Sequence, residues 1–160
     1  MTEALESKKT NFTNRNLLQK ILDYNYKNID NLTDEEKGNI QALKEEGFAI
    51  VTAHQPNLFM GPLYTISKAI SAISLANQVN KDLGSKKIVP IYVIGSEDHD
   101  KEELLNANLF GKKYEWQTSQ TGSVGQMTVD NQLVDLTNEW VDSFGNLPFT
   151  EELKDIYQCV

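Results

Sequence analysis

The chain has 160 residues, which is enough for one domain with a sizeable hydrophobic core. Its net charge of −8 and its single arginine, Arg15, argue against a duplex nucleic acid as partner, because neutralising phosphates needs clustered basic side chains. No apolar stretch approaches the roughly 20 residues that span a bilayer, so we expect a globular cytoplasmic protein with no membrane partner.

The first third of the sequence predicts two helices after a disordered lead over residues 1–11. Apolar residues recur at helical spacing from Leu17 to Ile29, and Thr13 or Asn14 can cap that helix. Thr33 followed by Glu36 is a capping-box pattern for the second helix.

The middle of the chain predicts a strand, a helix and a second strand. Residues 48–53 form a short apolar run, residues 62–83 carry one apolar stripe at helical spacing, and residues 88–94 are almost continuously apolar. Continuous apolar strands are typical of parallel sheets that are buried on both faces. The fold class we predict is therefore α/β, with a parallel sheet and flanking helices.

The last third gives weaker signals. We expect a short helix over residues 101–106, an alternating strand over 113–118, and helices over 133–144 and 150–157. Two parallel strands are fewer than a doubly wound sheet usually has. We therefore expect residues 12–160 to be a portion of a domain in a larger protein, with uncovered apolar surface that favours a homo-oligomer.

The first motif, Ala53 to Tyr64, follows the first predicted strand and contains His54, Gln55, Asn57 and Gly61. Ligands of open α/β sheets bind beyond the carboxyl ends of the strands, and N–H groups at the start of the next helix can bind an anion. His54 could donate to a phosphate or act as an acid or base. The alternative is a packed turn in which Leu58 and Phe59 fill the core.

The second motif follows the second predicted strand and contains Glu97, Asp98, His99 and Asp100. These side chains could orient an amine, hold a divalent cation, or pair a carboxylate with an imidazole as a base. The alternative is a solvated loop in which Asp98 or Asp100 caps a following helix. If the carboxylates repel one another, Asp98→Asn leaves folding unharmed.

Metal chemistry has less support in the sequence. The acidic run lacks the i, i+4 ligand spacing of helical zinc sites, and the lone cysteine, Cys159, excludes both an intrachain disulfide and a cysteine-based metal site. Cys159 lies close to a chain end, so we expect it to be incidental, and we predict no metal ligands. The loop from Gly122 to Gly125 could approach a ligand closely through its backbone.

Together these motifs resemble those of one enzyme family. The pattern T-x-H-Q-x-x-L-F-x-G-P-L-Y-x-x-x-K, followed by V-P-x-Y, S-E-D-H-D, G-K-K-x-x-W and T-G-x-V-G, resembles the cysteine-adding enzyme of bacillithiol biosynthesis, the BshC family. The resemblance covers about residues 12–130. It implies a Rossmann-like fold and a ligase that joins L-cysteine to glucosaminyl-malate.

The resemblance also implies roles for the two motifs. His54, Gln55, Asn57 and Gly61 would line the end of the pocket that binds a nucleotide cofactor, ATP or ADP. The four residues Glu97, Asp98, His99 and Asp100 would face the second substrate. Two rival functions remain open, namely a metabolite-binding module without catalysis and a metal-dependent hydrolase that uses the acidic run.

Overall fold

The structure is a computed structural model that describes residues 2–85 and 87–157, so the prediction for Cys159 lies outside the described residues. The chain divides into two compact units. The first unit contains Met1–Thr52 and Lys68–Tyr92, and the second contains Ala53–Ser67 and Val93–Val160. The sequence predicts a portion of one domain over residues 12–160, and in the structure each of the two units has buried clusters of its own.

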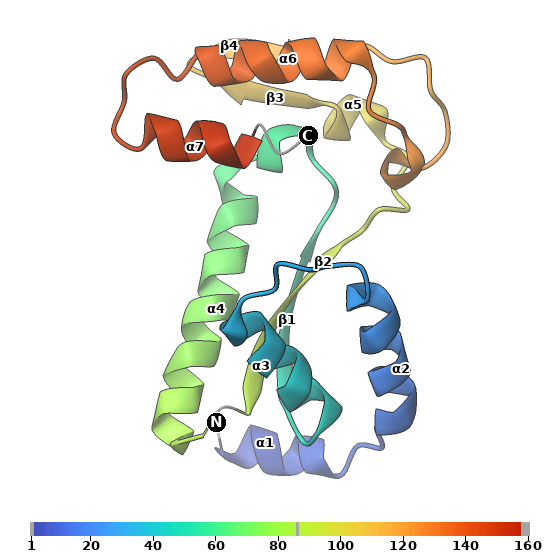
Figure 1. Cartoon of the computed structure of the whole chain (residues 1–160), viewed down its shortest axis with the longest axis vertical. Coiled ribbons are helices and arrows are strands. Elements are labelled where there is room, and N and C mark those ends of the chain that lie inside the picture. The colour runs from blue at the N-terminus through green and yellow to red at the C-terminus, as the bar shows by residue number, and fades with distance from the viewer. Residues whose placement is uncertain (1, 86, 158–160) are drawn as a thin grey trace. The chain divides into compact units, whose positions relative to one another are not determined.

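A parallel pair of strands lies at the centre of the first unit (Figure 1). The Phe48 N–H donates to the Lys87 carbonyl at 2.8 Å where the strands begin, and the Gly95 N–H donates to the His54 carbonyl at 2.9 Å where they end. Both partners therefore advance in the same direction, which confirms the predicted parallel sheet. The elements are α1 (Thr2–Lys9), α2 (Arg15–Tyr26), α3 (Asp34–Lys44), β1 (Phe48–His54), α4 (Leu63–Leu83) and β2 (Ile88–Ile94).

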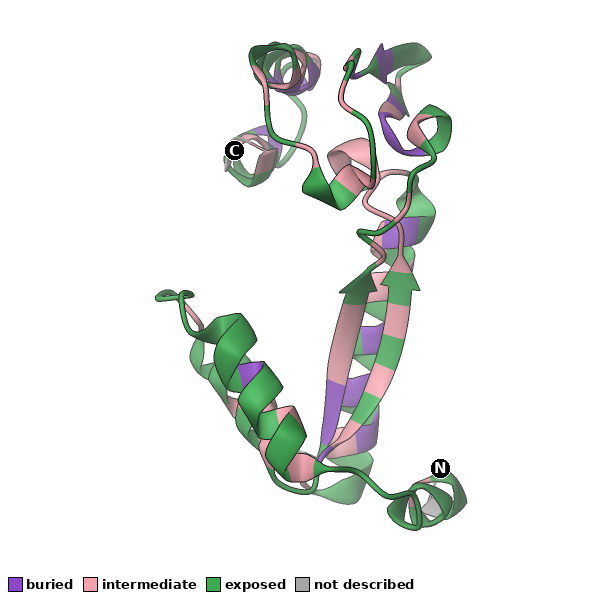
Figure 2. Ribbon diagram, turned by 90° about the vertical axis from the view of Figure 1, so that its right-hand side faces the viewer, coloured by how far each residue is buried: buried purple, intermediate pink, exposed green. Residues whose placement is uncertain are grey.

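Helices pack against both faces of the strand pair at the start of β2, whereas one face of β1 stays exposed, which the sequence did not predict. Ala76 and Val79 of α4 pack with Ile88 on one face. Leu22 of α2 and Leu43 of α3 pack with Val89, which points to the opposite face because side chains alternate along a strand. Figure 2 shows the buried residues on the start of β2 and on the strand-facing side of α4. This arrangement is the α/β fold that the sequence predicts.

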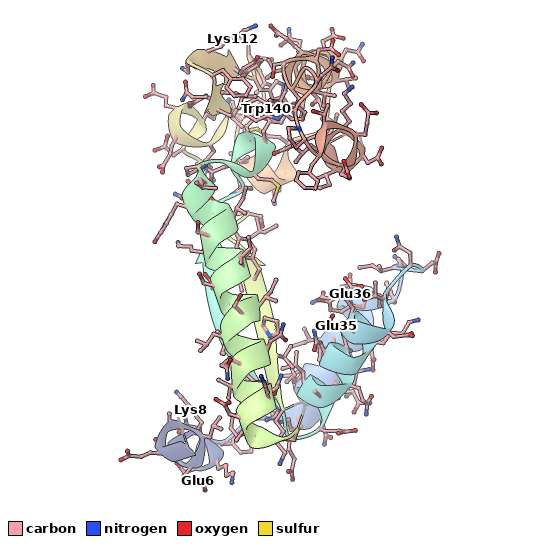
Figure 3. All side chains as sticks on the ribbon, turned by 90° about the vertical axis from the view of Figure 1, so that its left-hand side faces the viewer. Glu6, Lys8, Glu35, Glu36, Lys112 and Trp140 are labelled. Carbon is pink, nitrogen blue, oxygen red and sulfur yellow. The ribbon has the colours of Figure 1, made fainter. Side chains whose placement is uncertain are left out.

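Local signals set the helix ends of the first unit. The Asn14 side chain accepts from the Leu17 N–H, and Thr33 forms the predicted capping box with Glu36. Figure 3 shows Glu35 and Glu36 at the start of α3, where their negative charges favour the positive end of the helix dipole. Helix α4 ends at Gly84, whose φ of 62° is the left-handed conformation that glycine adopts most easily.

The disordered lead expected over residues 1–11 is not what the structure shows, because residues 2–9 form α1. This segment has little apolar periodicity, so hydrophobic pattern alone could not reveal a helix. Helix formation has two local supports: an ion pair between Lys9 and Glu6 and the packing of Leu5 against the cluster of Ala76, Val79 and Ile88.

The second unit contains a hairpin, of which the sequence pattern predicts only the second strand. Strands β3 (Asn106–Leu109) and β4 (Lys112–Glu115) pair antiparallel, with Ala107 opposite Tyr114 and Leu109 opposite Lys112. Phe110 and Gly111 form the tight turn, with φ values of 50° and 81° that match a two-residue turn of the type common in hairpins. The elements of the second unit are η1 (Leu58–Met60), α5 (Lys101–Leu104), β3 (Asn106–Leu109), β4 (Lys112–Glu115), η2 (Val124–Gln126), α6 (Asn131–Asp142) and α7 (Thr150–Tyr157).

Aromatic packing around Trp140 holds the second unit together. The Trp140 ring stacks on Phe59 with centroids 4.4 Å apart and meets the Tyr114 ring edge to face at 5.1 Å. Figure 3 shows Trp140 inside this cluster and Lys112 at its margin, where Lys112 pairs with Glu139. Phe59 belongs to the first motif, so the core of the second unit anchors the loop that follows β1.

The helices of the chain can also be compared with what a bilayer requires. Over residues 2–85 and 87–157, no helix combines the length and the apolar character needed to cross a membrane.

Candidate functional site

Both sequence motifs lie in the second unit, at the carboxyl ends of the two parallel strands. The first begins in the last residues of β1, and the second begins one residue after β2 ends at Ile94. The Gly95 N–H donates to the His54 carbonyl at 2.9 Å, which holds the two chain segments together where the motifs start. The geometry agrees with the expectation that ligand sites lie beyond the carboxyl ends of parallel strands.

A side-chain hydrogen bond connects the motifs directly. The Gln55 Nε2 amide donates to Asp98 Oδ2 at 3.0 Å, across 43 positions of sequence. Both side chains are partly buried. A glutamine from the first motif and a carboxylate from the second therefore form one structural feature, which the spacing of the motifs did not reveal.

Asp98 accepts further hydrogen bonds from its own loop. Its Oδ1 accepts from the Asp100 N–H at 3.0 Å. The backbone N–H of Asp100 and the Gln55 amide together lower the pKa of Asp98 below its ordinary value of 3.8, since both donors favour the ionised form. A carboxylate held ionised in this way is a weak proton acceptor near neutral pH, and its geometry suits the positioning of two loops.

The other residues of the acidic run divide into two kinds. Asp100 caps helix α5, since its Oδ1 accepts from the Glu103 N–H at 3.1 Å, which matches the capping alternative raised from the sequence. Glu97 and His99 are exposed, and the Glu97 carboxylate folds back toward Gly95, since a Cβ placed there would lie 3.8 Å from Glu97 Oε1. Asp100 is exposed as well, so only Asp98 of the acidic run is partly buried.

A third segment packs against the acidic run. The Val124 N–H donates to the Asp98 carbonyl at 2.7 Å, and the Gly125 N–H donates to the Ser96 carbonyl at 2.9 Å. A Cβ at Gly125 would lie 2.4 Å from Ser96 Cβ, so only glycine allows this approach. The sequence indicates that this glycine-rich loop could approach a ligand through its backbone, and in the structure it lies against the backbone of the second motif.

His54 and the start of α4 lie close together in the first motif. His54 Nδ1 accepts from the Gln55 N–H at 2.9 Å, which in the neutral ring assigns the proton to Nε2, and the ring lies edge-on to Tyr64. At the start of α4, the Thr65 N–H donates to the Pro62 carbonyl at 2.8 Å. Arg15 belongs to the first unit and donates to the Leu43 and Gly47 carbonyls.

The turn from Asn57 to Gly61 has an unusual backbone. Phe59 and Met60 both adopt positive φ angles, 51° and 66°, and Gly61 has a φ of 62°. A Cβ at Gly61 would lie 2.6 Å from Asn57 Cβ, so the Asn57 side chain occupies the space that a larger residue would need. The Asn57 Oδ1 atom is buried and has no hydrogen-bond partner in the structure. Such an atom is costly to bury.

A metal centre finds no support in the residues described. Across residues 2–85 and 87–157, no group of three or more histidine, cysteine, aspartate or glutamate side chains could hold a metal ion. The acidic run instead uses Asp98 and Asp100 to accept backbone hydrogen bonds. The hypothesis of a metal-dependent hydrolase therefore has no structural basis here.

Comparisons with known proteins agree with the motifs. Relatives named "Putative cysteine ligase BshC" include those of Flavobacterium johnsoniae, 34% identical over 98% of this chain, and Cytophaga hutchinsonii, 35% identical over 97%. A relative of the same name from Flavobacterium psychrophilum is 37% identical over 78% of the chain. The matched regions cover 30%, 28% and 24% of these relatives, so the chain spans about a third or less of their length.

The family profile extends over every position of the sequence. It is described as the N-terminal Rossmann-like domain of bacillithiol biosynthesis BshC, and it matches residues 1–160. This chain therefore belongs to the BshC family, in the region of its N-terminal Rossmann-like domain.

Proposed function

We propose that this chain forms the N-terminal part of a cysteine ligase that joins L-cysteine to glucosaminyl-malate in bacillithiol biosynthesis. Family membership and the names of the relatives support the reaction class. The observation that carries the proposal to particular residues is the hydrogen bond between Gln55 and Asp98, because it unites the two family motifs in one feature.

The chemistry assigns different tasks to the two motifs. The amine of glucosaminyl-malate attacks the cysteine carboxyl carbon, forms the amide bond and loses a proton, while the activating group leaves. In the second motif, exposed Glu97 and His99 would bind the ammonium form and accept the proton. Asp98 and Asp100 would hold that loop in place, since their carboxylates already accept backbone hydrogen bonds.

Amide formation from a free carboxylate is uphill in water, and a nucleotide such as ATP supplies the leaving group when it is bound. Within the first motif, the His54 Nε2–H donor would suit an anionic group, and the His54 ring lies 6.1 Å from the ring of Tyr64 at the start of α4. Gln55, Asn57 and Gly61 would shape that end of the pocket.

A chimera provides the most direct test. The matching region of the Flavobacterium johnsoniae relative, which covers 98% of this chain, can be replaced by this sequence. The chimera is incubated with L-cysteine, glucosaminyl-malate and ATP, and the ligated product is measured by mass spectrometry. We expect product formation, and we expect Glu97→Gln to lower kcat/KM by roughly 10²-fold, the effect of losing a positioned acid–base group.

A matched control is Glu102→Gln, which removes an exposed carboxylate from the neighbouring helix α5. A folded chimera that makes no product would favour the metabolite-binding alternative. Equal losses in the Glu97 and Glu102 variants would contradict the role assigned to Glu97.

A further inference from the structure

A glutamine between the hairpin and α6 closes a loop through its side chain. The Gln120 Nε2 amide donates to the Thr128 carbonyl at 2.9 Å, and Gln120 Oε1 accepts from the Thr128 N–H at 2.8 Å. The side-chain amide therefore pairs with both backbone polar groups of Thr128, as a neighbouring strand would. We call residues 120–128, which this pairing closes, the 120–128 loop.

Further contacts hold the base of the 120–128 loop. The Gln120 N–H donates to the Thr118 hydroxyl at 3.2 Å, and the Lys101 ammonium group at the start of α5 donates to the Gln120 carbonyl. Gln120 and Lys101 are partly buried, so water competes less with these hydrogen bonds than with exposed ones. The backbone N–H, the carbonyl and the side-chain amide of Gln120 are thus all engaged.

The tip of the 120–128 loop holds the backbone of the acidic run. The Gly125 N–H donates to the Ser96 carbonyl at 2.9 Å. The Val124 N–H donates to the Asp98 carbonyl at 2.7 Å. These two carbonyls lie on either side of Glu97, whose own side chain is exposed. The loop therefore fixes the backbone that determines the direction of the Glu97 side chain.

We propose that Gln120 is a positioning residue for the acidic run. By closing the 120–128 loop it aims the two N–H groups of the loop tip, and these place the Glu97 carboxylate toward the substrate amine. The identity of that amine, glucosaminyl-malate, rests on the proposed function, whereas the placement of the acidic run rests on the hydrogen bonds alone.

The alternative is that apolar packing places the loop without help from Gln120. Val124 and Met127 pack against the apolar cluster around Trp116. Apolar contacts have no preferred direction, so they keep the loop near the acidic run without aiming its N–H groups. The two accounts therefore differ in what removal of the Gln120 side chain should do.

Hydrogen exchange in this chain tests the coupling without any activity. Gln120→Ala removes the closure, so the N–H groups of Val124 and Gly125 should exchange about tenfold faster, as followed by NMR. The control is Gln117→Ala, which truncates an exposed glutamine of the same segment and should leave both rates unchanged. Unchanged rates in Gln120→Ala would show that apolar packing places the loop, and would overturn the proposal.

Kinetics of the chimera connect the loop to the substrate. Gln120→Ala should raise the KM for glucosaminyl-malate about tenfold, the effect of misplacing one charge-assisted hydrogen bond, and leave the KM for ATP unchanged. Loss of folded enzyme would lower kcat and leave both KM values as they are. Gln120→Glu keeps the acceptor for the Thr128 N–H, so it should give a smaller increase, and it supplies the measurement if Gln120→Ala does not fold.

The two experiments separate this inference from the proposed function. A wild-type chimera without product, together with faster exchange in Gln120→Ala, would reject the ligase reaction and support the role of Gln120 in placing the acidic run. An active wild-type chimera in which Gln120→Ala and Gln117→Ala share one KM for glucosaminyl-malate would overturn the inference and leave the proposed function intact. An equal rise in the KM for ATP would also overturn it, since the change would not be specific to the second motif.

Discussion

Asp98 has the most constrained carboxylate of the candidate site. It accepts from a side chain 43 residues earlier and from the backbone of its own loop, and its carbonyl accepts from Val124. Three segments of the second unit therefore meet at one residue. The sequence could show that Asp98 stands in a dense acidic run, but it could not show that other segments supply donors to it.

These hydrogen bonds change the effect on stability that we expect from replacing Asp98. From the sequence alone, Asp98→Asn relieves repulsion and leaves folding unharmed. In the structure the asparagine amide would face donors from Gln55 and from the backbone of Asp100, so we expect the variant to be less stable at neutral pH. Equal or greater stability of Asp98→Asn at about pH 6 would show that repulsion dominates.

The pH dependence of stability gives a second, independent measure of the hydrogen bonds that Asp98 accepts. Because the folded pKa of Asp98 is lowered, its contribution to stability is present above the unfolded pKa and is lost as pH falls through the folded value. The difference in urea midpoint between the wild type and Asp98→Asn should therefore shrink between about pH 6 and pH 2. Glu36 also has a lowered pKa, but it is present in both proteins and cancels from the comparison.

Gly61 offers a test of the turn in the first motif. Gly61→Ala places a residue at a φ of 62° and brings its Cβ within 2.6 Å of Asn57 Cβ. Gly145→Ala in the same unit meets the same left-handed backbone, at a φ of 59°, with no atom within 4 Å. We expect the control to lose about 1 kcal/mol of unfolding free energy and Gly61→Ala about 1–3 kcal/mol more.

Urea unfolding followed by tryptophan fluorescence measures both glycine variants. If Gly61→Ala lost no more unfolding free energy than Gly145→Ala, the Asn57 side chain would have room to move. Close packing against Asn57 would then not explain why position 61 needs glycine.

At the scale of single elements, the side chain of Asp130 that caps α6 also accepts a hydrogen bond from the buried Trp116. Asp130 Oδ1 accepts from the Leu133 N–H at 2.9 Å and from the Trp116 indole at 3.0 Å. One oxygen thus fixes the start of a helix and satisfies a buried indole N–H. Helix α6 in turn carries Trp140 to the centre of the unit.

We expect Asp130→Ala to cost about 2–4 kcal/mol, the sum of a lost cap and an unsatisfied indole donor. Asn14→Ala removes a cap that accepts from the Leu17 N–H, and it should cost only about 1 kcal/mol. Chemical denaturation followed by circular dichroism gives both values. Similar losses in the two variants would mean that the contact with Trp116 adds little.

The elements that could be predicted are those with strong local signals. The capping box at Thr33, the stripe of α4 and the continuous run of β2 each determine their structure within a short window. Strand β3 was missed because its sequence, Asn106–Leu109, has no β-branched residue and gains its burial from Tyr114 and Trp140. The local sequence pattern does not reveal tertiary contacts of this kind.

The features of the candidate site also fall into those that the sequence predicts and those that it does not. The position of both motifs at the ends of β1 and β2 follows from the strand pattern, and it was predicted. The hydrogen bond from Gln55 to Asp98 and the approach of Gly125 to Ser96 depend on the exact path of three loops. No spacing in the sequence encodes those paths.

At the scale of the whole molecule, apolar side chains remain exposed on the sheet and on α4. Val51 of β1 is 60% exposed, and Ile70 and Ile73 of α4 are 57% and 47% exposed. Exposed apolar surface of this kind commonly marks an interaction site. The homo-oligomer expected from the sequence stays a prediction, and these residues are where it can be tested.

We expect the chain to self-associate at micromolar to millimolar concentration, as measured by sedimentation velocity. Replacing both Ile70 and Ile73 by glutamine should shift the protein toward the monomer, whereas the control Lys81→Gln on the same helix should not. A wild type that sediments as a monomer over the whole concentration range would contradict this prediction.

Both tryptophans of the chain, Trp116 and Trp140, belong to the second unit. Their emission therefore reports the surroundings of the hairpin and α6, while far-ultraviolet circular dichroism is dominated by helices, of which α2, α3 and most of α4 lie in the first unit. The chain thus carries a natural optical label on one unit. A change in circular dichroism that occurs apart from the change in tryptophan emission therefore reports unfolding in the first unit, without adding a dye.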